Sequence, residues 1–373
     1  MSEGVGNRPL RVAFLMPGVG VVRRGAELFV LELAAALSRE EDFEIEILSR
    51  GPAPLPGHRV RALPRDSPLH RVYAATRLGR KVLDTLFLDP INLEWATATL
   101  SAWPRLRRGG YDLAVIEGGL VGGWVGRWLR RRIGLPFIDV AHGNSPKWEV
   151  AFARQRPDRV VTFTREQAAM LQWRVPGAAI EVIPHGVDLG VFDAGVEPVK
   201  LPVEPPVVLA AGSVDAQKRI HLALEAVARL ERGSLVVLGE GAAAADLDAR
   251  AKRLLGTGRY LRTVLDRHEL PAWYAAADVF TLPSASEAFG LVYLEAAACG
   301  TPSVAPDDPV RREVLGEAAL YTEVENLASY AATLAEALAR DWGDQPRRRA
   351  EELSFSATVD SYSRLFRQVA AAS

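Results

Sequence analysis

The stretch that most constrains the fold runs from Leu282 to Ala305, LPSASEAFGLVYLEAAACGTPSVA. An apolar strand, AADVFTLPS, leads into it, and a polar turn then connects that strand to Gly290 and to a helical run over 291–298. Gly300 ends the helix, and a second short strand is expected directly after it. A strand, a glycine-containing turn and a helix N-terminus in this order point free backbone N–H groups at an anion. The stretch therefore predicts a βα unit and favours an anion site at its turn.

Two carboxylates frame this turn. Glu287 lies in the turn itself, and Glu295 follows about one to two turns into the helix. Because a carboxylate beside a phosphate repels it, these groups favour another role, accepting hydrogen bonds from sugar or ribose hydroxyls. An ordinary βα unit with two solvated glutamates explains the same spacing, since Leu291, Leu294 and Ala298 form the apolar stripe and Glu295 lies at its edge. The spacing alone leaves both interpretations open.

The alternation of strands and helices indicates the architecture. From Arg11 to Ile183 short β-branched strands alternate with helices, apart from a Pro-, Arg- and Gly-rich loop over 51–70 and a mostly helical segment over 71–106. A second alternating series begins at Val207. Such alternation predicts parallel sheets, and 373 residues suit two domains. We therefore expect two doubly wound α/β domains that face each other and share one cleft beyond the carboxyl ends of their strands.

The domain boundary is expected in PHGVDLGVFDAGVEPVKLPVEPP, which is rich in proline and has no periodicity. We place the N-terminal domain at 1–195 and the C-terminal domain at 196–355.

Composition excludes several classes of protein. One cysteine, Cys299, rules out an intramolecular disulfide and fits a reducing compartment, and the six scattered histidines give no metal-ligand cluster. No apolar run approaches the ~20 residues of a membrane span, and the N-terminus shows no signal-peptide pattern. We therefore expect a cytoplasmic protein with no bound metal.

The net charge of −1 conceals an asymmetry. Residues 1–195 hold 26 Lys and Arg against 21 Asp and Glu, a net of +5, whereas 196–373 hold 19 against 25, a net of −6. The basic half is compatible with peripheral contact to an anionic membrane surface or to an anionic substrate. A solvated helix face explains the same residues equally well. The pI and the absence of interleaved aromatic residues argue against nucleic acid as a partner.

Some side chains are candidates only when the pattern around them is considered. Lys218 lies in a βα turn, where a cation neutralises a diphosphate, and its neighbour Arg219 has the same capacity; a solvated loop lysine is the simpler interpretation. His142 follows a strand and precedes Gly143, which suits a base, a donor to a sugar hydroxyl or a satisfied core histidine. Asp246-Leu247-Asp248 has the form of some metal sites, but it lies in an Ala-rich helical run and is expected on the solvated surface.

These motifs together resemble one family. Glu287 and Glu295 are separated by AFGLVYL and followed by AAACGTPSVA, and YAAADVFTLPS precedes them. IPHGVDLGVF, LGEGAA, RRGAELFVLELAAAL and VAHGN resemble further segments of the same family, so the resemblance covers nearly the whole chain. The chain is similar to the retaining glycosyltransferases of family 4, the glycosyltransferase 1 group, with the GT-B fold of two Rossmann-like domains. That fold implies that the last helix, within 356–373, crosses back to the N-terminal domain.

The resemblance also implies roles for residues. Glu295 would hold the ribose hydroxyls, Lys218 would neutralise the diphosphate and His142 would contact the donor sugar. The other residues implied at the donor are Gly25, Ala26, Ser213, Arg219, Glu287, Ala288, Phe289, Gly290 and Leu291. His142, Lys218 and Glu287 are the candidate catalytic residues. The chain departs from the family where Ser213 replaces a usual arginine and where Arg219 follows Lys218 in place of a common glycine.

The expected function is therefore a retaining, metal-independent hexosyltransferase. It would move a sugar from a nucleoside-diphosphate sugar to an acceptor hydroxyl, with no cofactor beyond that donor. The acceptor stays open among a glycan, a lipid-linked molecule and a small molecule. Two other functions stay open as well: a nucleotide-sugar-binding protein without turnover, which Ser213 motivates, and a nucleotide-sugar epimerase of the same fold.

Overall fold

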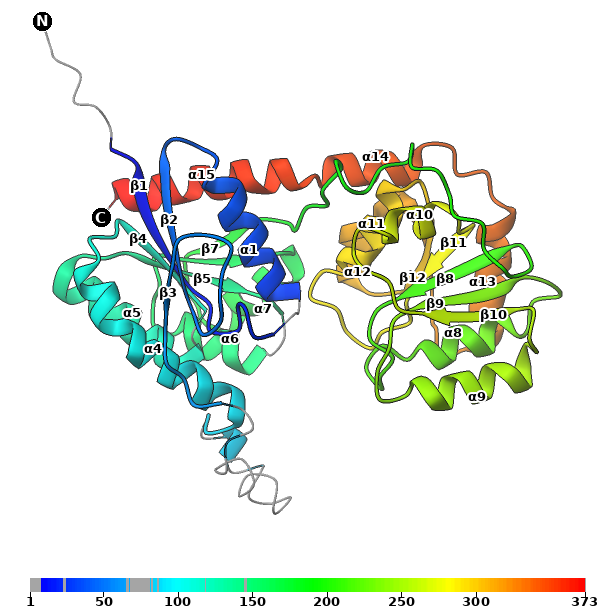
Figure 1. The fold of residues 1–373 in the computed structure, drawn as a ribbon, viewed down its shortest axis with the longest axis horizontal. Coiled ribbons are helices and arrows are strands. Elements are labelled where there is room, and N and C mark those ends of the chain that lie inside the picture. The colour runs from blue at the N-terminus through cyan, green and yellow to red at the C-terminus, as the bar shows by residue number, and fades with distance from the viewer. Residues whose placement is uncertain are drawn as a thin grey trace, which may run out of the picture. The chain divides into compact units, whose positions relative to one another are not determined.

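The structure is a computed structural model of the chain, and it divides into two compact units (Figure 1). The N-terminal unit comprises Met1–Ile183 and Val359–Ser373, and the C-terminal unit comprises Pro184–Thr358. The residues that the structure describes are 8–22, 25–64, 67, 81, 83–85, 87–117, 119–143 and 146–372.

The division falls at 183/184, whereas the sequence placed it at 195/196. The segment between these positions is attached to the C-terminal unit by its backbone. Val187 forms a bridge with Ser354, and its N–H donates to the carbonyl oxygen of Leu353 (2.9 Å). Val187 lies within the proline-rich stretch that suggested the boundary, and its composition gives no sign of this attachment.

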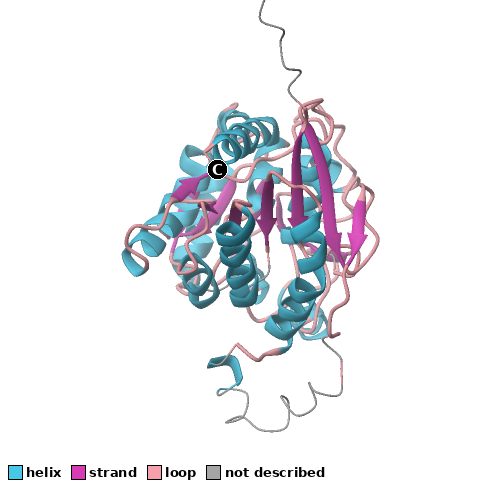
Figure 2. Cartoon of the chain, turned by 90° about the vertical axis from the view of Figure 1, so that its left-hand side faces the viewer, coloured by secondary structure: helices cyan, strands magenta, loops and turns pink. Residues whose placement is uncertain are grey.

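The N-terminal unit contains a parallel sheet of seven described strands in the order β3-β2-β1-β4-β5-β6-β7. The strands are β1 (Leu10–Leu15), β2 (Phe43–Ser49), β3 (Gly57–Arg59), β4 (Leu113–Ile116), β5 (Phe137–Ala141), β6 (Arg159–Thr162) and β7 (Ile180–Val182). Helices lie against these strands in Figure 2. They are α1 (Gly25–Leu37), α4 (Pro90–Arg108), α5 (Gly119–Ile133), α6 (Pro146–Ala153), α7 (Arg165–Arg174) and most of α15 (Phe355–Ala371).

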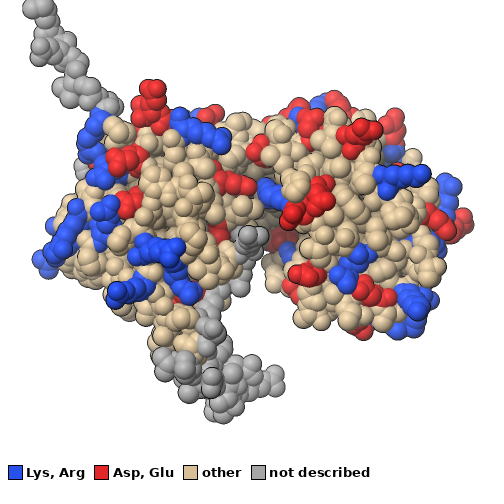
Figure 3. All heavy atoms as spheres, viewed as in Figure 1, with Lys and Arg blue, Asp and Glu red and all other residues tan. Residues whose placement is uncertain are grey.

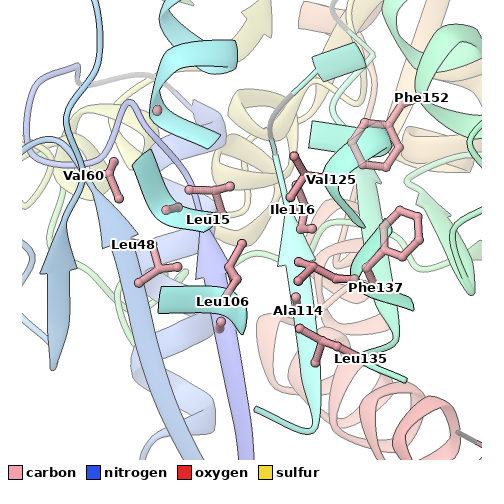
Figure 4. Packing of buried hydrophobic residues seen from close by; sticks show 14 residues of the cluster. Leu15, Leu48, Val60, Leu106, Ala114, Ile116, Val125, Leu135, Phe137 and Phe152 are labelled. Atoms are coloured by element: carbon pink, nitrogen blue, oxygen red, sulfur yellow. The ribbon is translucent and has the colours of Figure 1, made fainter. Parts of the chain in front are cut away.

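One face of this sheet carries a core built by α4 and α5. Leu15, Ala114 and Phe137 of the strands pack with Leu106 of α4 and Val125 of α5 (Figure 4). The hydrophobic effect of burying this apolar surface holds the two helices against the strands.

The other face is covered by α1 and the C-terminal helix. Tyr362 and Phe366 of α15 are fully buried, and Phe366 packs against Phe14 of β1 with ring centroids 5.9 Å apart. Arg367 pairs with Asp42 at 2.6 Å on the same side. The last helix therefore belongs to the N-terminal unit through its packing, although its first turn is part of the C-terminal one.

The C-terminal unit repeats the plan with six described strands in the order β10-β9-β8-β11-β12-β13, all parallel. The strands are β8 (Val207–Ala211), β9 (Ser234–Leu238), β10 (Tyr260–Thr263), β11 (Val279–Thr281), β12 (Ser303–Pro306) and β13 (Ala319–Thr322). The helices are α8 (Ile220–Val227), α9 (Ala244–Leu254), α10 (Leu270–Ala275), α11 (Leu291–Ala298), α12 (Pro309–Leu315), α13 (Leu327–Ala339) and α14 (Gln345–Glu352).

Several short elements were not assigned from the sequence: β3, α6, α12, β13 and α14. β3 lies in the segment predicted as a loop, and all three of its residues are exposed, so no burial pattern marks it. Of the segment predicted as mostly helical over 71–106, residues 90–106 lie in α4, and residues 68–80 lie outside the described part of the chain.

Each sheet has one place where the strand order reverses. In the N-terminal unit this switch point lies between β1 and β4, and in the C-terminal unit between β8 and β11. Connections leave such neighbouring strands in opposite directions, which opens a crevice at their carboxyl ends where ligands of doubly wound folds bind. A ligand site is therefore expected at the turns that follow these four strands.

Candidate active site

The turn after β8 is fixed on both sides by neighbouring turns. The N–H of Val214 donates to the carbonyl oxygen of Glu240 after β9 (2.9 Å), and the N–H of Ala285 after β11 donates to that of Gln217 (2.9 Å). The two turns approach so closely that a Cβ on Gly239 would lie 2.0 Å from the carbonyl oxygen of Gly212. The glycine-rich turn after β9 is therefore required by packing between two backbones.

Lys218 and Glu287 meet at this switch point. Lys218 Nζ lies 2.6 Å from Glu287 Oε1, and the two side chains are 23% and 13% exposed. The sequence predicted both residues at the donor, and the structure brings them together from the turns after β8 and β11. The pair presents one cation and one carboxylate side by side.

Asp215 shapes the turn that carries this lysine. Its carboxylate accepts hydrogen bonds from the Ser213 hydroxyl (2.7 Å) and from the backbone N–H groups of Gln217 and Lys218 (2.9 Å each). Burial raises the pKa of Asp215, but these bonds outweigh it and hold the pKa below its usual value. Ser213 thus donates to a carboxylate that stays ionised. The hydrogen bonds of Asp215 hold the turn in its conformation, and sequence patterns did not single out this residue.

Arg219 contacts protein groups in this structure. Its Nε donates to the carbonyl oxygen of Pro283 (2.7 Å), and its Nη1 pairs with Glu325. Its backbone has φ 51° and ψ 33°, a left-handed conformation that favours glycine and that costs a residue with a side chain about 1–2 kcal/mol. The guanidinium therefore joins the turn after β8 to the end of β11 and to the segment before α13.

The start of α11 offers backbone donors. Gly290 precedes the helix with φ 87° and ψ 50°, and no side chain caps the first turn. Because the first N–H groups of a helix have no intrahelical acceptor, those of Leu291 and Val292 are available to an anion. The N–H of Tyr293 donates to the carbonyl oxygen of Gly290 (3.0 Å). Phe289 is buried and its ring lies 5.7 Å from that of His185, which fixes the turn formed with Ala288 and Gly290.

Glu295 is a buried carboxylate one turn further along α11. It is 3% exposed and accepts from the hydroxyl of Tyr274 of α10 (3.1 Å). Arg267 Nη1 lies 3.4 Å from its other oxygen. Burial and the neighbouring Glu295 raise the pKa of Tyr274 well above its usual value, so the hydroxyl keeps its proton and donates.

Both carboxylates of the Asp-x-Asp motif in α9 form ion pairs with arginine side chains. Asp248 accepts two bonds from Arg262 (2.9 and 2.7 Å) and one from Tyr260 (2.7 Å), and Arg262 holds the pKa of Asp248 below its usual value. Asp246 pairs with Arg250 at 2.8 Å. Within the described ranges, no group of three or more His, Cys, Asp or Glu side chains is arranged to hold a metal ion.

In the N-terminal unit, His142 follows β5 and is tied to the turn after β4. Its Nε2 lies 3.0 Å from Oε1 of Glu117, and its ring contacts those of Phe29 and Phe163. Burial lowers the pKa of His142, but the charge and hydrogen bond of Glu117 outweigh it, so the pKa lies above its usual value. Sequence patterns did not single out Glu117, because its partner is 25 residues away along the chain.

Gly25 and Ala26 begin α1, close to the switch point of the N-terminal sheet. A Cβ added to Gly25 would have no neighbour within 4 Å among the described residues outside its own helix and adjacent positions. The φ of Gly25 is not in the left-handed region. Neither packing nor backbone conformation therefore requires this glycine, which leaves space beside the backbone. Arg23 and Arg24, which belong to the same predicted motif, lie outside the described residues.

Surface charge differs in pattern between the units. On the face in Figure 3, basic side chains gather on the lower and left parts of the N-terminal unit, whereas both signs are interspersed on the C-terminal unit. Many basic residues have acidic neighbours, such as Arg105 with Glu46 (2.8 Å) and Arg130 with Asp158 (3.0 Å). In the described ranges, no helix has the length and apolar character required to cross a membrane.

Two family models match the chain. The model described as "Glycosyltransferase Family 4" matches residues 23–191, and the model described as "Glycosyl transferases group 1" matches residues 205–340. The two matches fall on successive parts of the chain and include the turns described above.

Curated relatives and solved structures extend this similarity. The chain is 33% identical over 347 residues to a D-inositol 3-phosphate glycosyltransferase of Xylanimonas cellulosilytica, covering 80% of this chain and 81% of the relative. It is 30% identical over 344 residues to one of Mycolicibacterium paratuberculosis, covering 80% and 75%. A sucrose-phosphate synthase of Thermosynechococcus elongatus superposes with a TM-score of 0.78 at 22% identity, covering 98% and 100%. HepE of Anabaena in complex with UDP and glucose superposes with 0.67 at 17% identity, covering 96% and 100%.

Proposed function

Because the chain belongs to the glycosyltransferases of group 1 and family 4, we propose that it moves a sugar from a nucleoside-diphosphate sugar to an acceptor hydroxyl, with retention of configuration and without a metal ion. The observation that carries this proposal is the switch point of the C-terminal unit. There Lys218 and the uncapped start of α11 face the same turn, each suited to a phosphate.

Each donor group has a partner in this arrangement. The diphosphate binds Lys218 and the N–H groups that begin at Leu291, and it competes with Glu287 for the lysine. Glu287 then accepts from a hydroxyl of the donor sugar. The ribose hydroxyls donate to Glu295, whose buried position gives these bonds a low-dielectric environment. On this proposal Arg219 supports the turn, since its guanidinium already has protein partners. It does not take over the role of the arginine that the family usually has at the position of Ser213.

The transfer then proceeds on one face of the sugar. The bond between the anomeric carbon and the diphosphate oxygen breaks, and the acceptor oxygen bonds to that carbon from the same side. The acceptor proton passes to an oxygen of the leaving diphosphate. The protein contributes orientation and stabilisation of the charge that develops on the leaving group, and Lys218 is the candidate cation for that charge.

A donor and acceptor panel tests the function. The curated relatives are named for D-inositol 3-phosphate, and a structural relative holds UDP and glucose, so UDP-sugars with that acceptor come first, followed by GDP- and dTDP-sugars. We expect a glycoside with the anomeric configuration of the donor, identified by the proton coupling of its anomeric carbon. A product of inverted configuration contradicts retention. A donor epimer formed without acceptor indicates an epimerase, and a thermal shift without product indicates a binding protein.

Metal independence has its own test. Both carboxylates of the Asp-x-Asp pair are bonded to arginines, and Lys218 supplies the positive charge that a metal provides elsewhere. We expect the transfer rate to be unchanged in EDTA, with Asp248→Asn as a variant of unaltered rate. Loss of activity in EDTA that Mn²⁺ or Mg²⁺ restores would contradict this part of the proposal.

A further inference from the structure

His142 is held at the carboxyl edge of the N-terminal sheet by ring contacts and by one nitrogen. The ring centroids of Phe29 and Phe163 lie 6.0 and 5.4 Å from its own. Its Nε2 lies 3.0 Å from Oε1 of Glu117, which directly follows β4. The two side chains are only 10% and 6% exposed. These contacts hold the imidazole ring in one orientation.

The pairing with Glu117 also determines which nitrogen is left for substrate. Among residues that the structure describes, Glu117 is the hydrogen-bond partner of the imidazole, and it takes Nε2. Because a carboxylate accepts, the proton of this bond lies on Nε2. Nδ1 is then the atom that can meet a ligand, as an acceptor in the neutral ring or as a donor in the imidazolium.

We propose that Glu117 is a positioning residue for the transfer reaction, which holds His142 with Nδ1 towards the substrate and favours the protonated ring. This inference rests on the proposed transfer function and on the role that the family resemblance implies for His142, a contact with the donor sugar. The protonated ring donates its Nδ1–H to an oxygen of the substrate. Glu117 acts only through the histidine.

Charged groups from the surrounding elements support the imidazolium. Glu27 of α1 and Glu149 of α6 add to the effect of Glu117 in raising the pKa of His142 against the opposing effect of burial. Removal of the Glu117 charge therefore withdraws the largest favourable contribution.

Two further groups face the same region but stay neutral. Asp139 of β5 is buried, and burial, helped by Glu117 and Glu149, raises its pKa well above its usual value. Burial likewise raises the pKa of Tyr362 of α15 well above its usual value. Neither group competes with Glu117 as the counterion of His142.

Glu149 provides a matched control. Glu117 and Glu149 are both 7% exposed, and both act on the turn that contains His142. Glu149, however, accepts from the backbone N–H of Gly143 and from the side-chain amide of Gln167 (3.2 Å), not from the ring. A structural role for buried carboxylates would make the two substitutions equivalent, whereas the proposal makes them different.

An NMR titration of the histidine ring tests the inference without any need for activity. The chain has six histidines, and the His142 signal is assigned by its loss in His142→Gln. We expect Glu117→Gln to lower the titration midpoint of His142 by about one unit or more, because a charge in contact is removed. Glu117→Asp restores most of the shift, and Glu149→Gln changes it less. An unchanged midpoint in Glu117→Gln overturns the inference and leaves the proposed function standing.

Kinetics provide the second readout. We expect Glu117→Gln to lower kcat/KM at least tenfold at neutral pH, mainly through kcat, and to move the alkaline fall of the pH profile to lower pH. In a His142→Gln background the same substitution should have no further effect, since Glu117 acts through the ring. Equal and additive losses in both backgrounds would overturn the inference. If no donor is turned over at all, the proposed function fails while the NMR titration still decides the role of Glu117.

Discussion

The switch points of the two units have the same topology and opposite charge. In the C-terminal unit, Lys218 and the uncapped start of α11 offer positive charge, with Glu287 as the partner of the lysine. In the N-terminal unit, buried carboxyl groups surround one imidazole; they are Glu27, Glu117, Asp139 and Glu149. On the proposed function, the C-terminal edge binds a diphosphate, and the groups of the N-terminal edge are suited to sugar hydroxyls and to a proton. Fold determines where each site lies, and a few side chains at strand ends determine what it binds.

The largest effect is expected from Lys218→Ala. Charge develops on the leaving diphosphate, so loss of the nearest cation should lower kcat/KM at least a hundredfold, about 2.7 kcal/mol. Steady-state kinetics measure it, with Lys252→Ala on exposed α9 as the control of unaltered rate. Wild-type kinetics in Lys218→Ala would show that the C-terminal switch point does not hold the diphosphate.

Glu295→Gln should have the next largest effect. The ribose hydroxyls lose a charged acceptor, which costs about 1.5–3 kcal/mol and weakens donor binding by about 10- to 150-fold. Isothermal calorimetry with the donor measures this loss. Tyr274→Phe is the control, because it removes the hydroxyl that donates to Glu295 and keeps the carboxylate. Equal donor affinity in wild type and Glu295→Gln would contradict the assignment of the ribose hydroxyls to Glu295.

Arg219→Ala should separate support of the turn from binding of phosphate. Loss of its bond to the Pro283 carbonyl oxygen should lower stability by about 1–3 kcal/mol, with kcat/KM within about threefold of wild type. Arg219→Gly should be the more stable variant, since glycine accepts the φ of 51°. Thermal unfolding and kinetics of both variants check this. A tenfold fall in kcat/KM with unchanged stability would instead place Arg219 on the diphosphate.

The smallest effect concerns pH and stability. A carboxyl group whose pKa is raised by folding stabilises the fold most below its unfolded pKa, and this stabilisation is lost as pH rises through the folded pKa. Asp139 and Glu149 are such groups, and the raised pKa of His142 acts in the same direction. Between pH 5 and 8 the edge around β4 and β5 should therefore lose protection from hydrogen exchange.

The C-terminal switch point should behave differently. The lowered pKa of Asp215 gives stabilisation that is present above its unfolded pKa and is lost only as pH falls below about 4. Asp139→Asn should raise the melting temperature at pH 8 by about 2–4 °C, roughly 1 kcal/mol, and by less at pH 5. Equal pH dependence of hydrogen exchange at both switch points, or a lower melting temperature in the variant at pH 8, would contradict the difference in charge.

Sequence patterns predicted the fold because its signals are local. Phe43–Ser49 begins with alternating apolar residues and glutamates, and Val207–Ala211 is a short apolar run. Such strands alternate with helical segments along the chain, and parallel pairing follows from that order. The short edge strand Gly57–Arg59 was missed because its side chains are exposed and give no alternation. The compact units divide at 183/184, and the backbone attachment that follows this point leaves no trace in composition.

The spacing of residues indicated a turn only where these residues are close in sequence. Glu287, Gly290 and Glu295 lie in one βα unit, so their spacing indicated the turn. Glu117 is 25 residues from His142, and Glu325 is 106 residues from Arg219, so both pairs depend on tertiary structure. Long-range partners of this kind decide whether a cation is available to a ligand.

A crystal structure with a bound nucleoside diphosphate tests the central claim most directly. The nucleotide is the one among UDP, GDP and dTDP that raises the melting temperature most. We predict its phosphates within hydrogen-bond distance of Lys218 Nζ and of the N–H groups that begin at Leu291, with the ribose hydroxyls on Glu295. Phosphates bound through a metal ion at Asp246 and Asp248, or bound only to the N-terminal unit, would contradict the account.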